Sequence, residues 1–193
     1  MKSYFIIIMM FGLIGCAPTK NVVTNYYCED KSVNLFAFVG KKISVTEFDP
    51  NTEKQEEIKI DSVTGETIIQ KFYVMDVGFK CKYLVINNVF NKLENDTIEF
   101  IAYDHYGRPA FEEPEYVLLY ISKSSKGNHF FHQKYQYDYL RKNSDGIFYG
   151  HNYTVRQTKK HTTYKNKRIA NLEELFNNKK EGVFNHLFKQ NEN

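Results

Sequence analysis

Cysteine is the residue type whose position says most about chemistry in this chain, which has three of them. Cys16 follows a largely apolar run over residues 4–14 and the small residue Gly15, and Lys2 supplies a positive charge before the run. An apolar run of this length is typical of an export signal and is too short to span a bilayer comfortably. The sequence therefore predicts a signal peptide over residues 1–15, with the Cys16 thiol directly after it.

The segment Leu13-Ile14-Gly15-Cys16 resembles the lipobox of bacterial lipoproteins. In that family the cysteine thiol takes a diacylglycerol, the signal is cut before the cysteine, and the new amino group is acylated. The resemblance implies palmitate-type chains on Cys16, and two or more chains anchor a protein stably. An aspartate after the cysteine resembles an inner-membrane retention signal, and this chain has Ala17 there, which favours sorting to the outer membrane. We expect the protein to face the periplasm, with surface exposure as the alternative. An ordinary secretory signal that contains a cysteine is the alternative to lipidation.

Cys28 and Cys81 remain once Cys16 is committed to lipid. In an oxidising compartment two such thiols are expected to form a disulfide. In the chain-entropy treatment, closing a loop of that length stabilises a fold by about 4 kcal/mol. We therefore predict a disulfide between Cys28 and Cys81, with two buried free thiols as the alternative.

Histidines and acidic residues offer weaker signals. Asp104 and His105 lie in an expected loop, where a carboxylate beside an imidazole could do acid–base work, but no recognisable nucleophile accompanies them. His129 and His132 are three residues apart, which places them on opposite faces of a strand and disfavours a shared metal. The sequence also lacks a Gly-rich phosphate loop, a nucleophile elbow, His-Glu-x-x-His and Cys-x-x-Cys. We therefore expect no catalytic residues, no metal and no cofactor.

A basic segment near the C-terminus is the other candidate site. It contains six cationic residues and no acidic residue: Arg156, Lys159, Lys160, Lys165, Lys167 and Arg168. A solvated surface is the default interpretation, and a patch that binds anionic lipid or lipopolysaccharide is the second. Without Lys2 of the signal, the formal net charge of +3 falls to +2, and this near balance argues against nucleic acid as a partner.

An acidic connection over residues 47–66 carries seven Asp or Glu residues against two lysines. We expect a solvated loop, because the acidic residues lack the spacing of a calcium loop. Ile58 and Ile60 alternate with polar residues there and are expected to pair with Thr67–Val74 as an exposed hairpin. Two Asp-Ser/Thr-apolar triplets resemble a bacterial O-glycosylation pattern, with acceptors at Ser62 and Thr97.

Strand patterns dominate the rest of the chain. Leu35–Val39 is almost entirely apolar, and Gly40 directly after it indicates a bulge or a sharp bend. Phe79, Cys81 and Tyr83 share one face of a later strand by alternation. Further strands are expected at residues 97–102, 116–121 and 146–150.

The C-terminal segment has the pattern of a helix. Asn171 is a plausible N-cap with Glu174 at the capping-box position, and Gly182 is expected to split the helix into two pieces. One apolar stripe is expected to lie across an open barrel end: Leu172, Leu175, Phe176, Val183 and Leu187.

The domain organisation follows from length and composition. Removing residues 1–15 leaves 178 of the 193 residues, which suits one domain. We expect a tether over residues 16–27 and a single domain over residues 28–193, with its helix at about 171–189. Aromatic residues make up 16% of the chain and favour strands. The predicted fold class is mainly β, a small barrel with a C-terminal helix.

Order and spacing of these strands resemble the netrin-like domains, an OB-fold family that includes the tissue inhibitors of metalloproteinases. The resemblance extends over roughly residues 28–140 and is carried by four segments: Phe38–Ile43, Tyr83–Val85, Thr97–Phe100 and Val117–Tyr120. It implies an OB-like barrel, and a cysteine before the first strand that is able to pin to a central strand also fits the family. No short motif within these segments is diagnostic.

Taken with the empty catalytic search, the resemblance implies a non-enzymatic, lipid-anchored binding module for an envelope protein or glycan. The alternative is an envelope hydrolase or protease inhibitor that uses loop residues around His105. Inhibitors of the family chelate the target's zinc through the free amine and carbonyl of an N-terminal cysteine. An acylated Cys16 and an internal Cys28 offer no such amine, so we do not expect zinc-chelating inhibition.

Overall fold

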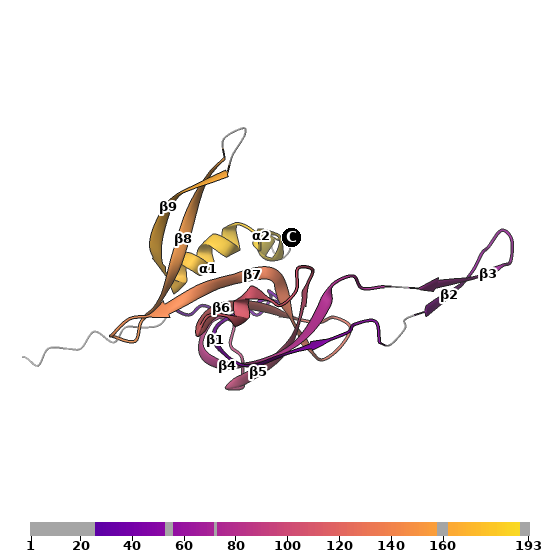
Figure 1. Ribbon diagram of the computed structural model, residues 1–193, viewed down its shortest axis with the longest axis horizontal. Coiled ribbons are helices and arrows are strands. Elements are labelled where there is room, and N and C mark those ends of the chain that lie inside the picture. The colour runs from indigo at the N-terminus through magenta and orange to yellow at the C-terminus, as the bar shows by residue number, and fades with distance from the viewer. Residues whose placement is uncertain (1–25, 53–55, 72, 158–161, 190–193) are drawn as a thin grey trace, which may run out of the picture.

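The computed structural model describes residues 26–52, 56–71, 73–157 and 162–189 (Figure 1). Within these ranges the fold is mainly β with a C-terminal helical segment, as the sequence predicts. The elements are β1 Phe36–Phe48, β2 Glu56–Ile60, β3 Thr67–Lys71, β4 Val77–Phe90, β5 Thr97–Asp104, the 3-10 helix η1 Ala110–Glu112, β6 Tyr116–Lys123, β7 Phe130–Lys142, β8 Phe148–Gln157, β9 Thr162–Asn171, α1 Leu172–Glu181 and α2 Asn185–Lys189.

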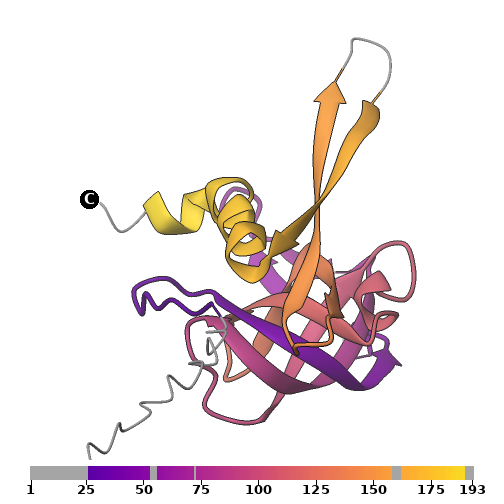
Figure 2. The ribbon, with the colours of Figure 1, turned by 90° about the vertical axis from the view of Figure 1, so that its left-hand side faces the viewer.

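Five of these strands form a ring, in the order β1-β4-β5-β7-β6 and back to β1. Neighbouring strands are antiparallel except at the closure, where β5 and β7 run parallel and pair Phe100 with Phe130 and Ile101 with Phe131. β8 and β9 extend the same sheet beyond β7. Figure 2 shows this pair standing away from the ring, beside the helices.

Gly40 marks the bend predicted in the first strand. The register between β1 and β4 shifts between Val39 and Gly40. A Cβ atom at Gly40 would lie 3.0 Å from the rings of both Phe38 and Tyr83. A residue without a side chain is therefore needed where β1 bends close to the packed interior.

Two separate apolar cores occupy the two faces of the ring strands. Alternation along β6 divides its residues, because Val117 and Leu119 lie in the core inside the ring while Leu118 and Tyr120 lie in a second core outside it. The inner core includes Phe38, Phe79, Cys81, Tyr83, Phe100, Phe111 and Ile121. The outer core includes Leu35, Val39, Val89, Phe90, Leu175, Phe176 and Phe184.

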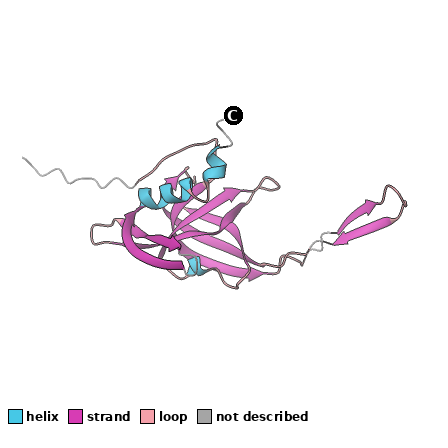
Figure 3. Ribbon diagram, turned by 90° about the horizontal axis from the view of Figure 1, so that it is seen from above, coloured by secondary structure: helices cyan, strands magenta, loops and turns pink. Residues whose placement is uncertain are grey.

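The C-terminal helices cover the outer core. Asn171 caps α1 as predicted, because its side-chain oxygen accepts a hydrogen bond from the Glu174 amide at 2.9 Å. Gly182 ends α1, and α2 follows, so the predicted split is confirmed. Two details differ from the expectation. Val183 is exposed and Phe184 is buried in its place, and the helices pack on the outer face of the sheet rather than across an open end (Figure 3).

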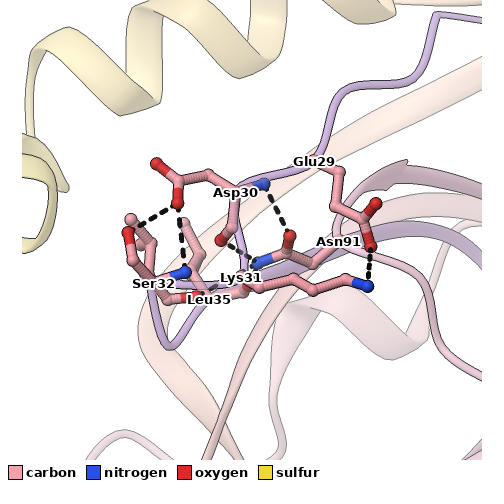
Figure 4. Close-up of polar contacts among 7 residues, drawn as sticks. Glu29, Asp30, Lys31, Ser32, Leu35 and Asn91 are labelled. Carbon is pink, nitrogen blue, oxygen red and sulfur yellow. Dashed lines mark hydrogen bonds and ion pairs between the residues drawn. The ribbon is translucent and has the colours of Figure 1, made fainter.

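Asn91 is a buried polar residue that holds the chain entering β1 against the end of β4 (Figure 4). Its amide nitrogen donates to the carbonyls of Asp30 at 2.9 Å, Val33 at 3.1 Å and Leu35 at 2.8 Å. Its amide oxygen accepts from the Asp30 amide at 2.8 Å, and its own backbone N–H donates to the Cys28 carbonyl at 3.1 Å. Asn91 also has φ 49°, a left-handed conformation that asparagine tolerates better than most residues.

Substitution Asn91→Ala should therefore destabilise the fold strongly. It removes the hydrogen bonds that the Asn91 amide donates to the carbonyls of Asp30, Val33 and Leu35. It also places an alanine, whose Cβ disfavours positive φ, in a left-handed conformation. We expect a loss of about 3 kcal/mol or more in the free energy of unfolding, measured by urea denaturation. Lys92→Ala, at the exposed neighbouring position, should change it by less than about 0.5 kcal/mol. Similar losses for the two variants would contradict this role for Asn91.

The β2–β3 hairpin confirms the expected pairing of Ile58 and Ile60 with the following segment. Ile58 pairs with Ile69 and Ile60 with Thr67, in a separate two-stranded sheet. The hairpin projects from one end of the ring (Figures 1 and 3). The sequence did not indicate β9, which pairs with β8 and carries part of the basic segment.

Candidate functional site

A groove of about 480 Å³ runs across the outer face of β1, β4 and β5, away from the part of that face that the helices cover. Strand alternation determines its lining. On β4, Cys81 lies in the inner core, so Lys80 and Lys82 on either side of it point outward. On β5, Phe100 is an inner residue, and Glu99 and Ile101 therefore face the groove.

The charged groups of the groove lie on adjacent strands. Lys82 is opposite Glu99 in the register, and its Nζ lies 2.9 Å from the Glu99 Oε1. Both side chains are well exposed, so this ion pair contributes less than about 1 kcal/mol and can rearrange around a ligand. The Lys80 ammonium lies 5.6 Å from the centroid of the Phe48 ring. Ser44 and Thr46 of β1 add hydroxyl groups to the same face.

The connection from β6 to β7 supplies the far wall of the groove. It contributes His129, and Phe130 follows as the first residue of β7. The Phe130 ring meets the Phe36 ring edge to face, with centroids 5.4 Å apart. The Lys123 ammonium lies 5.6 Å from the Phe36 centroid and 5.7 Å from that of Phe130. The groove thus combines hydroxyls, ammonium groups and aromatic edges, which suit a polar ligand with acidic or hydroxyl groups.

His105 does not pair with its neighbour Asp104. The Asp104 carboxylate accepts a hydrogen bond from the Tyr106 amide at 2.8 Å, and the His105 Nδ1 lies 3.3 Å from an oxygen of Asp76. Lys134 binds the other oxygen of Asp76, and this hydrogen bond lowers the pKa of that carboxyl, with a smaller contribution from His105. Among the described residues, no hydroxyl or thiol is hydrogen-bonded to His105. The arrangement is an ion-pair cluster without a nucleophile.

His129 lies on the outer side of the ring and His132 on its inner side, as their spacing predicts. His129 lines the groove, whereas His132 is buried inside the ring with its ring centroid 4.6 Å from that of Phe111. The His132 Nε2–H donates to the Gln136 carbonyl at 2.9 Å. In the described part of the chain, no three His, Cys, Asp or Glu residues are grouped so that they could hold a metal ion.

Burial lowers the pKa of His132 to about 4, and the ammonium of Lys179 acts in the same direction. In the unfolded chain a histidine titrates near pH 6.5. Between these pH values the unfolded state binds the proton and the folded state does not, so stability falls as the pH drops from about 6.5 towards 4. The loss amounts to roughly 3 kcal/mol by pH 4.

Substitution His132→Phe should remove this pH dependence. The variant keeps an aromatic ring beside Phe111 but has no group to protonate. We expect the free energy of unfolding of the parent chain to fall by roughly 3 kcal/mol more than that of the variant between pH 7.5 and 4. Urea unfolding at several pH values measures the difference, and His129→Phe in the exposed wall is the matched control. Parallel pH profiles for the parent and His132→Phe would contradict the assignment.

The predicted disulfide between Cys28 and Cys81 is wrong for this fold, in which both are free cysteines. The backbone of Cys28 forms an isolated β-bridge with Phe90, the last residue of β4, whereas Cys81 lies nine residues earlier in that strand. A strand rises about 3.3 Å per residue, and a disulfide needs Cα atoms within about 7 Å. Burial raises the pKa of the Cys81 thiol to about 12, which makes it an inert core residue.

The basic segment is distributed along a hairpin. Arg156 lies on β8 and Lys165 on β9, while Lys159 and Lys160 fall outside the described residues. Consecutive residues of a strand face opposite sides, so Lys167 and Arg168 do not share a face. The Arg168 guanidinium donates to the Glu174 carboxylate of α1 at 2.8 Å.

Cys16 and the signal peptide lie outside the described residues, as does the tether apart from residues 26–27. Neither α1 nor α2 combines the length and hydropathy that a bilayer-crossing helix requires, and no other α-helix is described.

Neither a protein-family model nor a curated protein nor a solved structure matches the chain. Three charged residues of the groove were not singled out from the sequence: Lys80, Lys82 and Glu99. Their alternation with apolar residues in β4 and β5 was the one signal that could have placed them on the outer face.

Proposed function

We propose that the chain is a lipid-anchored, non-enzymatic binding module with an OB-like, netrin-like fold. The ring order supports this class, because five strands closed by one parallel pair are consistent with an OB-type Greek-key arrangement. OB folds bind oligosaccharides and oligonucleotides on their second and third strands and on the loops beside them. The corresponding strands here are β4 and β5. The chain's small net charge favours a glycan or protein of the envelope over nucleic acid.

The observation that carries the proposal is the position of the groove. It lies on β4 and β5 and is bounded by His129, which follows the β6–β7 turn. Fold alone does not determine function, so the residues that line the groove carry the proposal. Cations from Lys80 and Lys82 and hydroxyls from Ser44 and Thr46 suit an extended ligand that presents acidic or hydroxyl groups.

An envelope hydrolase or inhibitor that uses His105 has less support. A nucleophilic mechanism needs a hydroxyl or thiol within hydrogen-bond reach of its base. His105 instead contacts the carboxylate of Asp76, whose pKa is lowered by Lys134 and which therefore remains ionised as an ion-pair partner. Chelation of a target's zinc is not part of the proposal, because an acylated Cys16 has no free amine.

Lipid anchoring is tested by Cys16→Ser. Without the thiol no diacylglycerol can be attached, so the protein should move from the membrane fraction to the soluble fraction after cell lysis and ultracentrifugation. Two acyl chains are needed for stable anchoring, and the variant would have none. Cys28→Ser is the matched control and should remain in the membrane fraction. A Cys16→Ser protein that stays with the membrane would rule out this anchor.

Ligand binding in the groove is tested by a photocrosslinking amino acid at Thr46, with Ser144 in the exposed β7–β8 turn as the control position. Irradiation of intact envelopes should give a discrete adduct from Thr46 and none from Ser144. The double charge reversal of Lys80→Glu and Lys82→Glu should reduce the adduct about tenfold, which corresponds to about 1.4 kcal/mol.

Protease and glycosidase digestion of the adduct separate a protein partner from a glycan. The proposal fails if Thr46 and Ser144 give the same adducts, or if the charge reversals leave the Thr46 adduct unchanged in a protein whose thermal unfolding is normal. Turnover of an envelope substrate that disappeared in His105→Ala would favour the enzyme instead.

A further inference from the structure

The β2–β3 hairpin has no partner strand beyond itself within the described part of the chain. It projects from one end of the ring, so neither of its outer edges is hydrogen-bonded to the seven-stranded sheet (Figure 1). A two-stranded hairpin alone is marginally stable in water, and three or more strands with an apolar face are needed for independent stability. Exposed strand edges are also templates for pairing with another chain.

One face of this hairpin is apolar and open to solvent. Ile58 and Ile69 are directly opposite one another in the register, and Ile60 lies two residues along from Ile58 on the same face. Their exposed fractions are 69% for Ile58, 55% for Ile69 and 73% for Ile60. A cluster of three exposed isoleucines on one face indicates a surface that is covered in an assembly.

The hairpin is directed away from the N-terminal end of the domain. It is inserted between Phe48 and Val77, so it leaves the ring where β4 begins. The N-terminal segment meets β4 at its opposite end, where Cys28 bridges to Phe90 and Tyr26 packs against Phe176. A membrane that holds the N-terminus is therefore not positioned to cover the isoleucines, and a protein surface is the better match.

The backbone pattern of β2 shows which groups face its free edge. The Asp61 amide donates to the Glu66 carbonyl at 2.9 Å, at the turn that joins the two strands. Hydrogen-bonded and non-hydrogen-bonded pairs alternate along an antiparallel ladder. Counting back from Asp61, the backbone groups of Lys59 turn towards β3, and those of Ile58 and Ile60 turn towards the free edge.

We propose that β2 pairs antiparallel with β2 of a second copy of this chain, about a two-fold axis at Ile58. This register makes the free-edge groups of Ile58 in the two copies each other's hydrogen-bond partners. It also places position 57, a glutamate, opposite position 59 of the other copy, a lysine, and the two-fold repeats the pair. The strand Glu-Glu-Ile-Lys-Ile is therefore complementary in charge to its own antiparallel copy.

The other edge of the hairpin lacks this property. A two-fold axis at Ile69 of β3 would place Ile68 opposite Gln70 and Thr67 opposite Lys71, with no pair of opposite charges. Pairing through β2 instead gives a continuous sheet of four strands, β3-β2-β2-β3, with the isoleucines of both copies on one face. Because the two-fold contact is the same patch on both copies, the assembly closes as a dimer.

Charge reversal tests this register in the full chain, purified in detergent and studied by analytical ultracentrifugation. Lys59→Glu places Glu57 of each copy opposite a glutamate at position 59 of the other copy. This like-charge repulsion occurs at two places, so the dimer dissociation constant should rise at least about tenfold. Adding Glu57→Lys restores opposite charges at both places and should return the constant to within about threefold of the parent value. Lys92→Glu makes the same charge change in the loop between β4 and β5 and should have no effect.

Disulfide trapping tests the position of the axis. Cα atoms of a hydrogen-bonded antiparallel pair lie about 5.5 Å apart, within the range of a disulfide. Ile58→Cys should therefore form a crosslinked dimer on mild oxidation, whereas Val63→Cys at the exposed tip should not. The parent chain, with its own cysteines, gives the background.

A chain that is monomeric up to about 100 μM would overturn the proposal and leave the hairpin face to another protein or to a membrane. A dimer that is indifferent to Lys59→Glu, or one that crosslinks equally through Val63→Cys, would overturn it as well. Thermal unfolding of each variant shows that the ring is intact. The dimer depends on the hairpin alone, so its failure would leave the proposed groove function untouched.

Discussion

The constraint on which the whole structure depends is that the central strands of the ring are apolar on both faces. β6 places Val117 and Leu119 inside the ring and Leu118 and Tyr120 outside it, so neither face can be left in water. The outer residues need a cover, and the C-terminal helices supply it with Phe176 at the centre. Burial of Tyr120 is completed by a hydrogen bond from its hydroxyl to the Asp138 carboxylate at 2.8 Å.

Covering one part of the outer face leaves another part available for binding. β4 contributes Val89 and Phe90 to the helix-covered core near its end, but Lys80 and Lys82 point outward near its beginning. The same strand thus contributes to the core at one end and lines the groove at the other. Polar and charged residues are tolerated there because they remain in contact with solvent, and their positions between inner-core residues keep them aligned along the groove.

Much of the local structure was predictable from the sequence, because it depends on neighbouring residues. The bend at Gly40, the cap at Asn171 and the exposed pairing of Ile58 were all expected from local patterns, and the structure has them. The start of β8 was expected, but the rest of β8 and all of β9 were missed, since their residues alternate poorly between polar and apolar. Val183 was assigned to the buried stripe in place of Phe184, because Gly182 interrupts the helical periodicity that the assignment assumed.

The sequence by itself determined the class of fold, the faces of the individual strands and the candidate anchor at Cys16, since each depends on the order of nearby side chains. Only the tertiary structure decided which strands are neighbours and at what register. That decision places Cys28 beside the last residue of β4, far from Cys81 in the same strand, brings Asp76 to His105, and sets His129 beside the groove. These contacts join residues that are distant in the chain, and alternation alone carries no information about which distant strands will pair.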